Sequence, residues 1–363
     1  MNHAPDARAD RAAEAVAAAG LDVAIVGDLV RPGDSNRESI ADVTWLTGYG
    51  GTSGTVVIGP GVRVFITDFR YTELAAEVVP ESFRIVDATA DILKEVASHL
   101  TGKAGFEPAK TSVETHRKLL EAIGEVAELV ATEDLLTDLR RVKDEAEIEA
   151  IAAAAALTDE VYAWIEEQGL SGRTEREVAL AAEQQMRELG AEGPSFPAIV
   201  ASGPNGALPH AVPGDRVIER GEYVTIDMGA IVDGYCSDCT RTLVEGDPDP
   251  AQKQVYDLVL ASQLAALEAV RAGANGRAVD AISREPIAEA GYGERYGHGL
   301  GHGVGIDVHE PPRLSKRSDD TLLAGDVVTV EPGIYIPGEF GVRIEDLVVV
   351  TEDGYRNLSS RPK

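Results

Sequence analysis

The chain has 363 residues, and its 62 acidic residues against 33 Lys and Arg give a formal net charge of -29. This charge argues against nonspecific binding to nucleic acid, because a phosphate backbone repels an acidic surface. The length exceeds that of one average domain and is enough to bury a sizeable core.

The first part of the chain, residues 1–134, is predicted to form an α/β domain. Its start is polar and has no apolar signal core, and no run is long enough to span a membrane, so we expect a cytoplasmic protein. Helices and strands then alternate, which indicates a mixed sheet. In chain order we expect a helix at 7–19, strands at 23–26, 55–58 and 62–67, and helices at 72–79, 90–100 and 113–123.

The second part, residues 135–363, is predicted to begin with a long amphipathic helix that opens at Leu139. Further helices are expected at 175–189 and 251–272, where they would cover a sheet. The strands of this sheet carry the acidic residues that are candidate metal ligands.

The first acidic pair lies on the strand-like runs 223–232 and 235–244, which an Asp-Gly hairpin signal of type I′ joins. In this hairpin Asp227 pairs with Thr240, so Asp227 and Asp238 share a face as diagonal neighbours, roughly 7 Å apart. Two carboxylates at this spacing can converge on bound cations. The alternative is two solvated acids on an exposed face, although Asp is disfavoured in apolar β-branched sequence unless it is paired or liganded.

Two cysteines, Cys236 and Cys239, form a C-x-x-C pair, which suggests zinc binding or redox chemistry. Their odd separation on a strand places the sulfurs on opposite faces, so one metal ion could not easily bind both. We favour the simpler interpretation of two small buried side chains with reduced thiols.

A Gly-rich segment at 297–312 carries three of the seven histidines, His298, His302 and His309, within twelve residues. Gly at every second position around the first two makes a poor helix and a poor apolar core. The segment is better suited to a backbone that passes close to a ligand and directs imidazoles at it.

The second acidic pair lies on two further predicted strands, 327–336 with Glu331, and 341–350 with Arg343 and Glu345 on one face. Glu331 precedes a Pro-Gly turn and could instead be an ordinary strand-end residue. Together, the two glutamates, the two aspartates and one histidine make an oxygen-rich set. Such a set suits two bridged divalent ions, Mn, Co, Fe or Zn, better than one structural zinc.

Four motifs resemble, in the same order, those of the pita-bread metallopeptidases, and within them the Xaa-Pro branch of prolidase and aminopeptidase P. They are Gly234-Tyr-Cys-Ser-Asp-Cys-Thr-Arg-Thr242, Gly297-His-Gly-Leu-Gly-His-Gly303 with the later His309-Glu-Pro-Pro312, Thr329-Val-Glu-Pro-Gly-Ile-Tyr335, and Gly341-Val-Arg-Ile-Glu-Asp346. The likeness covers roughly residues 137 to 363. Residues 49–54 and 67–71 resemble, more weakly, the creatinase-like N-terminal domain of the same family.

The resemblance implies a creatinase-like α/β domain at 1–134, and at 135–363 a pita-bread catalytic domain of the α+β class with a curved antiparallel sheet. It also implies two divalent ions, manganese first, a homodimer, and five metal ligands: Asp227, Asp238, His302, Glu331 and Glu345. Asp238 and Glu345 would bridge both ions. His210 and His309 match the histidines on the substrate side, and His298 is similar to a residue that supports this side.

The expected reaction is hydrolysis of the Xaa-Pro peptide bond. Two ions would lower the pKa of a shared water, which attacks the carbonyl as hydroxide, and Glu331 would pass its proton to the leaving nitrogen. His210 and His309 would stabilise the oxyanion, while Arg343 would orient Glu345 or meet the substrate.

The substrate length is open at this point. Arg317, or Arg313 beside it, could bind the carboxylate of an Xaa-Pro dipeptide, as the resemblance to prolidases implies. If that loop is instead ordinary charged surface, the chain is an aminopeptidase P that acts on longer peptides. The chain could also be a hydrolase of another small molecule or a binding module, although a binding module would lack ligands and all five are present. Neither nucleic acid nor a membrane is expected as a partner.

Overall fold

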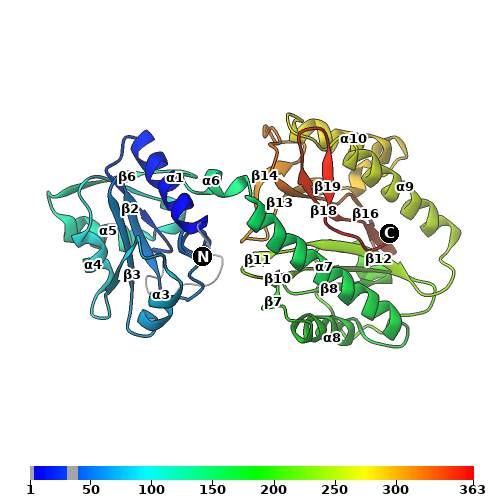
Figure 1. Cartoon of the computed structure of the whole chain (residues 1–363). Helices are drawn as coiled ribbons and strands as arrows, with labels where there is room; N and C mark the ends of the chain where they lie inside the picture. Colours follow the sequence, from blue (N-terminus) through cyan, green and yellow to red (C-terminus); the bar gives the residue numbers. More distant parts are fainter. Residues whose placement is uncertain (1–3, 31–39) are drawn as a thin grey trace. The chain divides into compact units, whose positions relative to one another are not determined.

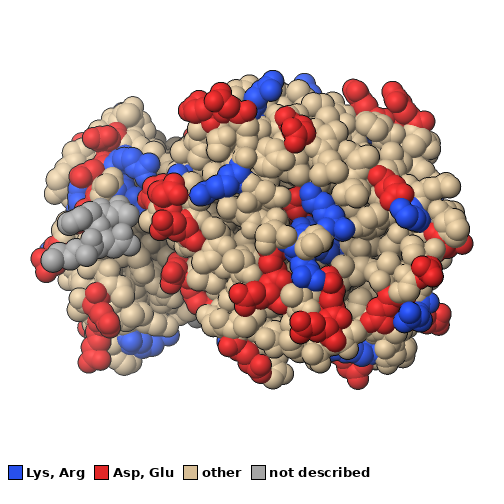
Figure 2. All heavy atoms as spheres, turned by 45° about the vertical axis from the view of Figure 1, so that its right-hand side comes forward, with Lys and Arg blue, Asp and Glu red and all other residues tan. Residues whose placement is uncertain are grey.

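The computed structural model describes residues 4–30 and 40–363, so the first three residues of the polar start lie outside the described part. The chain divides into two compact units, Met1–Arg140 and Arg141–Lys363 (Figure 1). The division falls within the short helix α6 (Thr137–Arg141). Acidic side chains are spread widely over the face seen in Figure 2, as the net charge of -29 requires.

The first unit contains a six-stranded mixed sheet with helices, which confirms the predicted α/β class. The strand order is β4-β3-β2-β1-β5-β6, with antiparallel pairs in the middle and parallel pairs toward both edges. Its elements are α1 (Ala4–Ala18), β1 (Val23–Val26), α2 (Ala41–Thr47), β2 (Thr55–Gly59), β3 (Val62–Thr67), α3 (Thr72–Val78), β4 (Arg84–Asp87), α4 (Ile92–Ser98), β5 (Gly102–Phe106), α5 (Val113–Ile123) and β6 (Ala127–Ala131).

Alternation along the strands builds the core of this unit. Val23 and Ile25 of β1 and Ile66 of β3 lie on one face of the sheet and pack with residues of α4 and α5. The helix predicted at 90–100 is shorter and ends at Ser98, and its start is set at Ile92 because the Asp91 side chain caps α4 by accepting a hydrogen bond from the Lys94 N–H. The short strands β4, β5 and β6 were not predicted.

A buried ion group in this unit joins α2 to segments far along the chain. Asp42 is 4% exposed and accepts hydrogen bonds from Arg140 Nη1 at 2.8 Å and from Lys110 Nζ. Burial alone raises the pKa of the Asp42 carboxyl, but attraction to Arg140 and Lys110 outweighs it and holds the pKa below its usual value. The group therefore stabilises the fold above pH ~4, and this contribution is lost as the pH falls through the lower pKa of the folded state.

Asp42→Asn is expected to lower the free energy of unfolding at neutral pH by about 3 to 5 kcal/mol, because it removes the buried carboxylate that binds the charged groups of Arg140 and Lys110. The difference between wild type and variant should shrink as the pH falls below about 4. Denaturant unfolding at several pH values measures this difference. The control is Glu121→Gln, which removes an exposed pair with Arg117 and should cost less than about 1 kcal/mol. A difference for Asp42→Asn that does not change with pH would contradict the prediction.

The second unit contains small antiparallel sheets covered by two pairs of helices. The sheet orders are β11-β10-β7, β12-β9-β8, β14-β13-β15-β18-β19 and β16-β17. Helices α7 and α8 pack on β8, β9 and β10, and α9 and α10 pack on β14, β15 and β18 (Figure 1). The helices are α7 (Glu145–Gln168), α8 (Glu175–Glu188), α9 (Pro250–Leu267) and α10 (Gly276–Glu289). The strands are β7 (Gly193–Pro194), β8 (Ile199–Ser202), β9 (Tyr223–Met228), β10 (Ala230–Val232), β11 (Tyr235–Cys236), β12 (Cys239–Val244), β13 (Gly301–Gly303), β14 (Glu310–Leu314), β15 (Val327–Val330), β16 (Gly333–Ile336), β17 (Phe340–Arg343), β18 (Asp346–Val350) and β19 (Tyr355–Asn357).

The long helix predicted to open at Leu139 begins later, so that boundary was wrong. Helix α7 starts at Glu145, where the Asp144 side chain accepts from the Glu147 N–H and the Glu147 side chain accepts from the Asp144 N–H. This capping box satisfies two backbone donors and fixes the helix start.

The predicted hairpin at residues 233–234 is present, with Asp227 opposite Thr240. Both turn residues have positive φ, 48° and 81°, as a type I′ turn requires. Both cysteines are buried and neither forms a disulfide, and Cys239 packs in the core between α7, α8 and β9, as the simpler interpretation predicts.

Each of the four long strands predicted for this unit is broken in the middle. The breaks separate β9 from β10, β11 from β12, β15 from β16, and β17 from β18. At the third break Pro332 has no N–H to donate to a ladder. At the fourth break the Glu345 N–H bonds to the Thr240 carbonyl of β12, and the chain changes partner from β16 to β15. Asp238, Glu331 and Glu345 lie in these breaks, where a side chain can leave the regular pleat.

Candidate active site

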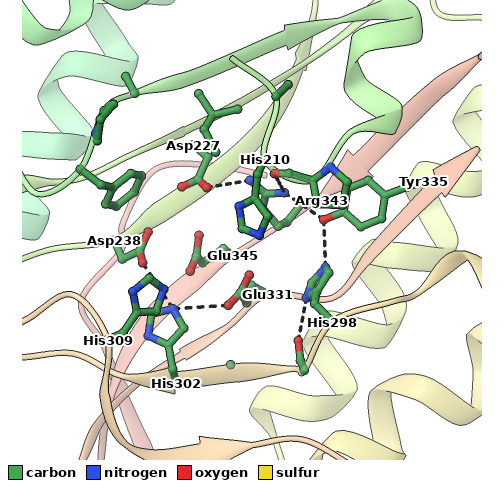
Figure 3. Close-up of a pocket in the computed structure, with 18 of the residues that line it drawn as sticks. His210, Asp227, Asp238, His298, His302, His309, Glu331, Tyr335, Arg343 and Glu345 are labelled. Atoms are coloured by element: carbon green, nitrogen blue, oxygen red, sulfur yellow. Dashed lines mark hydrogen bonds and ion pairs between the residues drawn. The ribbon is translucent and has the colours of Figure 1, made fainter. Parts of the chain in front are cut away.

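One pocket of ≈ 580 Å³ in the second unit is lined by nine of the ten residues predicted for the site (Figure 3). They are His210, Asp227, Asp238, His298, His302, His309, Glu331, Arg343 and Glu345. The interpretation of Asp227 and Asp238 as solvated surface acids is therefore wrong, as is that of Glu331 as an ordinary strand end. The lining also has an apolar part, called here the apolar wall, which includes Phe196, Pro197 and Ile199.

Three buried residues form the centre of the pocket. Asp238, His302 and Glu345 each offer one ligand atom, and these atoms lie within 4.8 Å of one another. His302 Nε2 lies 3.6 Å from Asp238 Oδ2 and 3.5 Å from Glu331 Oε1. His302 Nδ1 lies 3.1 Å from the Gly303 carbonyl, so a proton on Nδ1 leaves the Nε2 lone pair facing the carboxylates. Burial, and then the neighbouring His309, lower the pKa of His302 to about 3, which keeps the imidazole neutral.

The carboxylates repel one another at these distances. Burial, and then the charge of Glu345, raise the pKa of Asp238 well above its usual value, and burial and Glu331 do the same to the pKa of Glu345. Burial raises the pKa of Glu331 to about 8, although Arg343 opposes the shift. In addition, Asp227 Oδ1 is buried without a hydrogen-bond partner. Crowded carboxylates and an orphaned buried oxygen are costly without a cation, so the donor set fits divalent metal ions.

Arg343 orients two of the carboxylates, Asp227 and Glu345, by hydrogen bonds. Its Nη2 donates to Asp227 Oδ2 at 2.6 Å, and its Nε donates to Thr240 Oγ1 at 3.0 Å. Thr240 Oγ1 in turn donates to Glu345 Oε2 at 2.7 Å. One guanidinium therefore orients Asp227 directly and Glu345 through a hydroxyl, which is one of the two roles that the sequence left open for it.

A directed chain of hydrogen bonds continues from Arg343 to His298. Arg343 Nη1 donates to the Tyr335 hydroxyl at 2.9 Å, and this hydroxyl lies 2.9 Å from His298 Nε2. His298 Nδ1 lies 2.7 Å from the Gly299 carbonyl, which requires its proton, so Tyr335 donates to Nε2. Burial raises the pKa of Tyr335 to about 12 and lowers the pKa of His298 to about 4, so both rings are neutral.

Two members of this network, Thr240 and Tyr335, were not predicted as site residues. Each had a usable signal, since Thr240 is the predicted strand partner of Asp227, and Tyr335 ends the motif that contains Glu331. What the sequence could not supply was the contact of both with Arg343.

The two remaining histidines reach the pocket from different segments. His210 comes from the loop before β9, and His309 from the turn before β14 (Figure 3). The rings of His309 and His302 lie 4.3 Å apart between centroids. The described structure does not bring Arg317 to the pocket lining, whereas Arg313 lies in it. The reason is the register: Arg313 pairs with His302 and shares its face, while Arg317 follows the end of β14.

The family model for metallopeptidase family M24 matches residues 148–352, more than half of the chain. The chain belongs to metallopeptidase family M24. The model for the creatinase/prolidase N-terminal domain matches residues 8–142 of this M24 protein. The predicted family and two-domain class are thereby confirmed, and the M24 chain is a hydrolase.

Similar proteins cover nearly the whole of this M24 chain. The Xaa-Pro dipeptidase of Pyrococcus horikoshii is 38% identical over 323 residues, 88% of this chain and 90% of that protein. The solved Xaa-Pro dipeptidase from Bacillus anthracis has 38% identity and a TM-score of 0.91, and covers 99% of this chain and 98% of its own. The X-Pro aminopeptidase from Thermotoga maritima has 35% identity and a TM-score of 0.88, with coverage of 96% and 98%. Among the described residues of the M24 chain, no helix is both long and apolar enough to cross a membrane.

Proposed function

We propose that this M24 peptidase hydrolyses the peptide bond between a residue and a following proline, with dipeptides as preferred substrates. The observation that carries the proposal is the convergence of four carboxylates and one buried imidazole in a single pocket. Two relatives that are Xaa-Pro dipeptidases, each 38% identical, support the substrate class.

The metal ions belong to the proposal as two divalent cations. The residues that would hold them are Asp227, Asp238, His302, Glu331 and Glu345. Ions bound here would lower the pKa of a water molecule toward neutrality and polarise the substrate carbonyl. Manganese is the ion we expect first, ahead of cobalt, iron and zinc, and oxygen-rich sets with one imidazole accept all four.

Glu331 is the residue that we expect to move the proton. Its Oε1 lies 3.4 Å from the Thr329 hydroxyl, and the residue lines the pocket from the break between β15 and β16. Glu331 accepts a proton from the attacking water and donates it to the proline nitrogen, which leaves as a secondary amine. His309 and His210 donate hydrogen bonds to the oxygen on which negative charge develops.

The apolar wall and Arg313 are expected to contact the proline and the terminal carboxylate of a dipeptide. A proline nitrogen in a peptide has no N–H, so the wall that includes Phe196 and Ile199 needs no acceptor for it. Arg313 is exposed at the pocket and can bind the terminal carboxylate with two parallel hydrogen bonds. In a tripeptide this carboxylate lies one residue further away.

Arg313→Ala is expected to raise the Michaelis constant for Xaa-Pro dipeptides by about 10-fold or more, because a charge-assisted bidentate contact is lost. The difference in Michaelis constant between dipeptides and tripeptides should therefore become smaller. Steady-state kinetics with Ala-Pro and Ala-Pro-Ala measure both effects. Arg317→Ala is the matched control and should change neither. If the wild type prefers Ala-Pro-Ala and Arg313→Ala changes nothing, the enzyme is an aminopeptidase P and Arg313 belongs to ordinary surface.

The proposed function is tested by metal removal and a substrate panel. After treatment with a chelator, the chain should lose hydrolysis of Ala-Pro and regain it with manganese, cobalt, iron or zinc added singly. Ala-Ala serves as the control substrate and should be cleaved much more slowly. Hydrolysis of Ala-Pro that survives complete metal loss, or equal rates for Ala-Pro and Ala-Ala, would overturn the proposal.

A further inference from the structure

The mechanism above does not use Glu175, a buried carboxyl outside the metal-ligand set. Glu175 lies in the first turn of α8 and is 0% exposed. Its Oε1 accepts from the Ser202 N–H and the Ser202 hydroxyl, both at 2.8 Å. Its Oε2 accepts from the Gly214 N–H at 3.2 Å, and Asn205 Nδ2 donates to both oxygens at 3.1 and 3.0 Å. One carboxylate thus collects five donor contacts from a segment that lies 27 to 39 residues further along the chain.

These contacts lie at the two ends of a pocket wall. Between Asn205 and Gly214 runs the segment 206–213, called here the His210 loop, which supplies five lining residues from Pro209 to Pro213. The loop has an exposed tip, with Val212 86% exposed, so packing against its own apolar side chains does not hold the tip.

Two other contacts hold the loop near its start and middle. A Cβ on Gly341 of β17 would lie 1.9 Å from the Gly206 carbonyl, so the two backbones touch where both residues are glycine. Arg343 Nη1 lies 3.3 Å from the Pro209 carbonyl. The C-terminal end of the loop, after His210, is tied at Gly214, whose N–H donates to Glu175 Oε2 and whose carbonyl accepts from the Arg176 N–H at 3.0 Å.

We propose that Glu175 is a positioning residue that holds the His210 loop, and with it the His210 imidazole, against the pocket. This inference rests on the proposed function, in which His210 meets the substrate. A displacement of about 1 Å at such a group can cost on the order of 10²-fold in rate, so a carboxylate that does not itself touch the substrate can set turnover.

The chemistry of the contacts requires a carboxylate. All the partners of Glu175 are donors, and Arg216 Nη1 donates to Ser202 Oγ at 2.6 Å, which commits the Ser202 proton to Glu175. An amide at this position would direct its NH2 group at N–H donors of one end of the loop, whichever way it is turned. Glu175→Gln therefore removes side-chain hydrogen bonds at one end of the loop and weakens its attachment there, with almost no change in side-chain volume.

The same helix provides a matched control. Glu177 is the capping-box residue of α8, where its Oε2 accepts from the Thr174 N–H at 2.8 Å, and its hydrogen bonds stay within the first turn of the helix. Glu177→Gln thus perturbs the start of α8 without releasing the loop. Asn205→Ala, which removes the donor to both Glu175 oxygens, is the second variant if Glu175→Gln does not fold.

The first measurement is hydrogen–deuterium exchange of the full chain. Glu175→Gln should increase exchange in residues 203–214 relative to wild type, while Glu177→Gln leaves this segment unchanged. Asn205→Ala should act in the same direction as Glu175→Gln. Wild-type protection of 203–214 in both Glu175→Gln and Asn205→Ala overturns the inference. This measurement needs no substrate, so it decides the inference even if Xaa-Pro hydrolysis fails.

The second measurement is a double-mutant cycle with His210→Ala on Ala-Pro. Glu175→Gln should lower kcat/KM by about 10- to 100-fold in the wild-type background and by no more than about 2-fold when His210 is already Ala. Glu177→Gln should stay within about 2-fold in both. An equal loss from Glu175→Gln in both backgrounds means that it acts through general stability and not through His210, which also overturns the inference.

Discussion

Asp238→Asn is expected to remove the bound metal and nearly all peptide hydrolysis while the chain still unfolds in a cooperative transition. Asp238 is 5% exposed and lies 3.6 Å from His302 Nε2, and its ligand atom lies within 4.8 Å of that of Glu345. An amide has nearly the same shape but no charge, so it would bind divalent cations much more weakly than the carboxylate. In the metal-free chain the same change removes a repulsive buried charge, and the metal-free variant should be at least as stable as metal-free wild type.

Metal analysis of the purified protein, Ala-Pro hydrolysis and thermal unfolding with and without chelator measure these effects. Asp247→Asn, an exposed acid in the same unit, is the control and should keep metal content and activity. Full activity in an Asp238→Asn preparation that carries neither ion would sink the dinuclear mechanism.

Glu331→Gln is expected to keep part of the metal and to lower kcat by about 10³-fold or more. The remaining ligands still bind cations, but an amide cannot accept a proton from water or deliver one to the proline nitrogen. His309→Ala should cost about 10² to 10⁴ in kcat, the range of a single proton-transfer or oxyanion group. Single-turnover kinetics with metal content measured on the same samples separate loss of chemistry from loss of ions.

The comparison variant for both is His298→Ala. His298 bonds to Tyr335 and to the Gly299 carbonyl, so its loss should leave the ions bound and weaken the orientation of Arg343. Wild-type turnover in His309→Ala, together with loss of metal in His298→Ala, would show that the two histidines have been assigned the wrong way round.

The sequence predicts the architecture well where the pattern is local. Alternation of helices and strands gives the mixed α/β class of the first unit, and an Asp-Gly turn fixes the hairpin that sets Asp227 opposite Thr240. Where side chains compete with the pattern, the prediction fails. Asp144 stops α7 short of Leu139, because a capping box outweighs the apolar periodicity that continues before it.

The sequence by itself predicted nine of the residues that line the candidate site, because ligand chemistry restricts the residue types, and the motifs around Asp238, His302, Glu331 and Glu345 carry them at recognisable spacing. It could not decide between Arg313 and Arg317, since both lie in one charged loop, and only the pairing of Arg313 with His302 across β13 and β14 brings one of them to the pocket.

Contacts between distant segments were decided by the tertiary structure alone. Arg343 joins Asp227 and Tyr335, and Glu175 joins the start of α8 to both ends of the His210 loop, across separations of up to 116 residues. Asp238, Glu331 and Glu345 lie in strand breaks, outside the regular pleat, and the positions of these breaks also depend on which neighbouring strand each segment pairs with. The physical reason is the same in each case: a hydrogen bond needs a partner within about 3 Å, and local periodicity does not specify which distant segment packing will bring there.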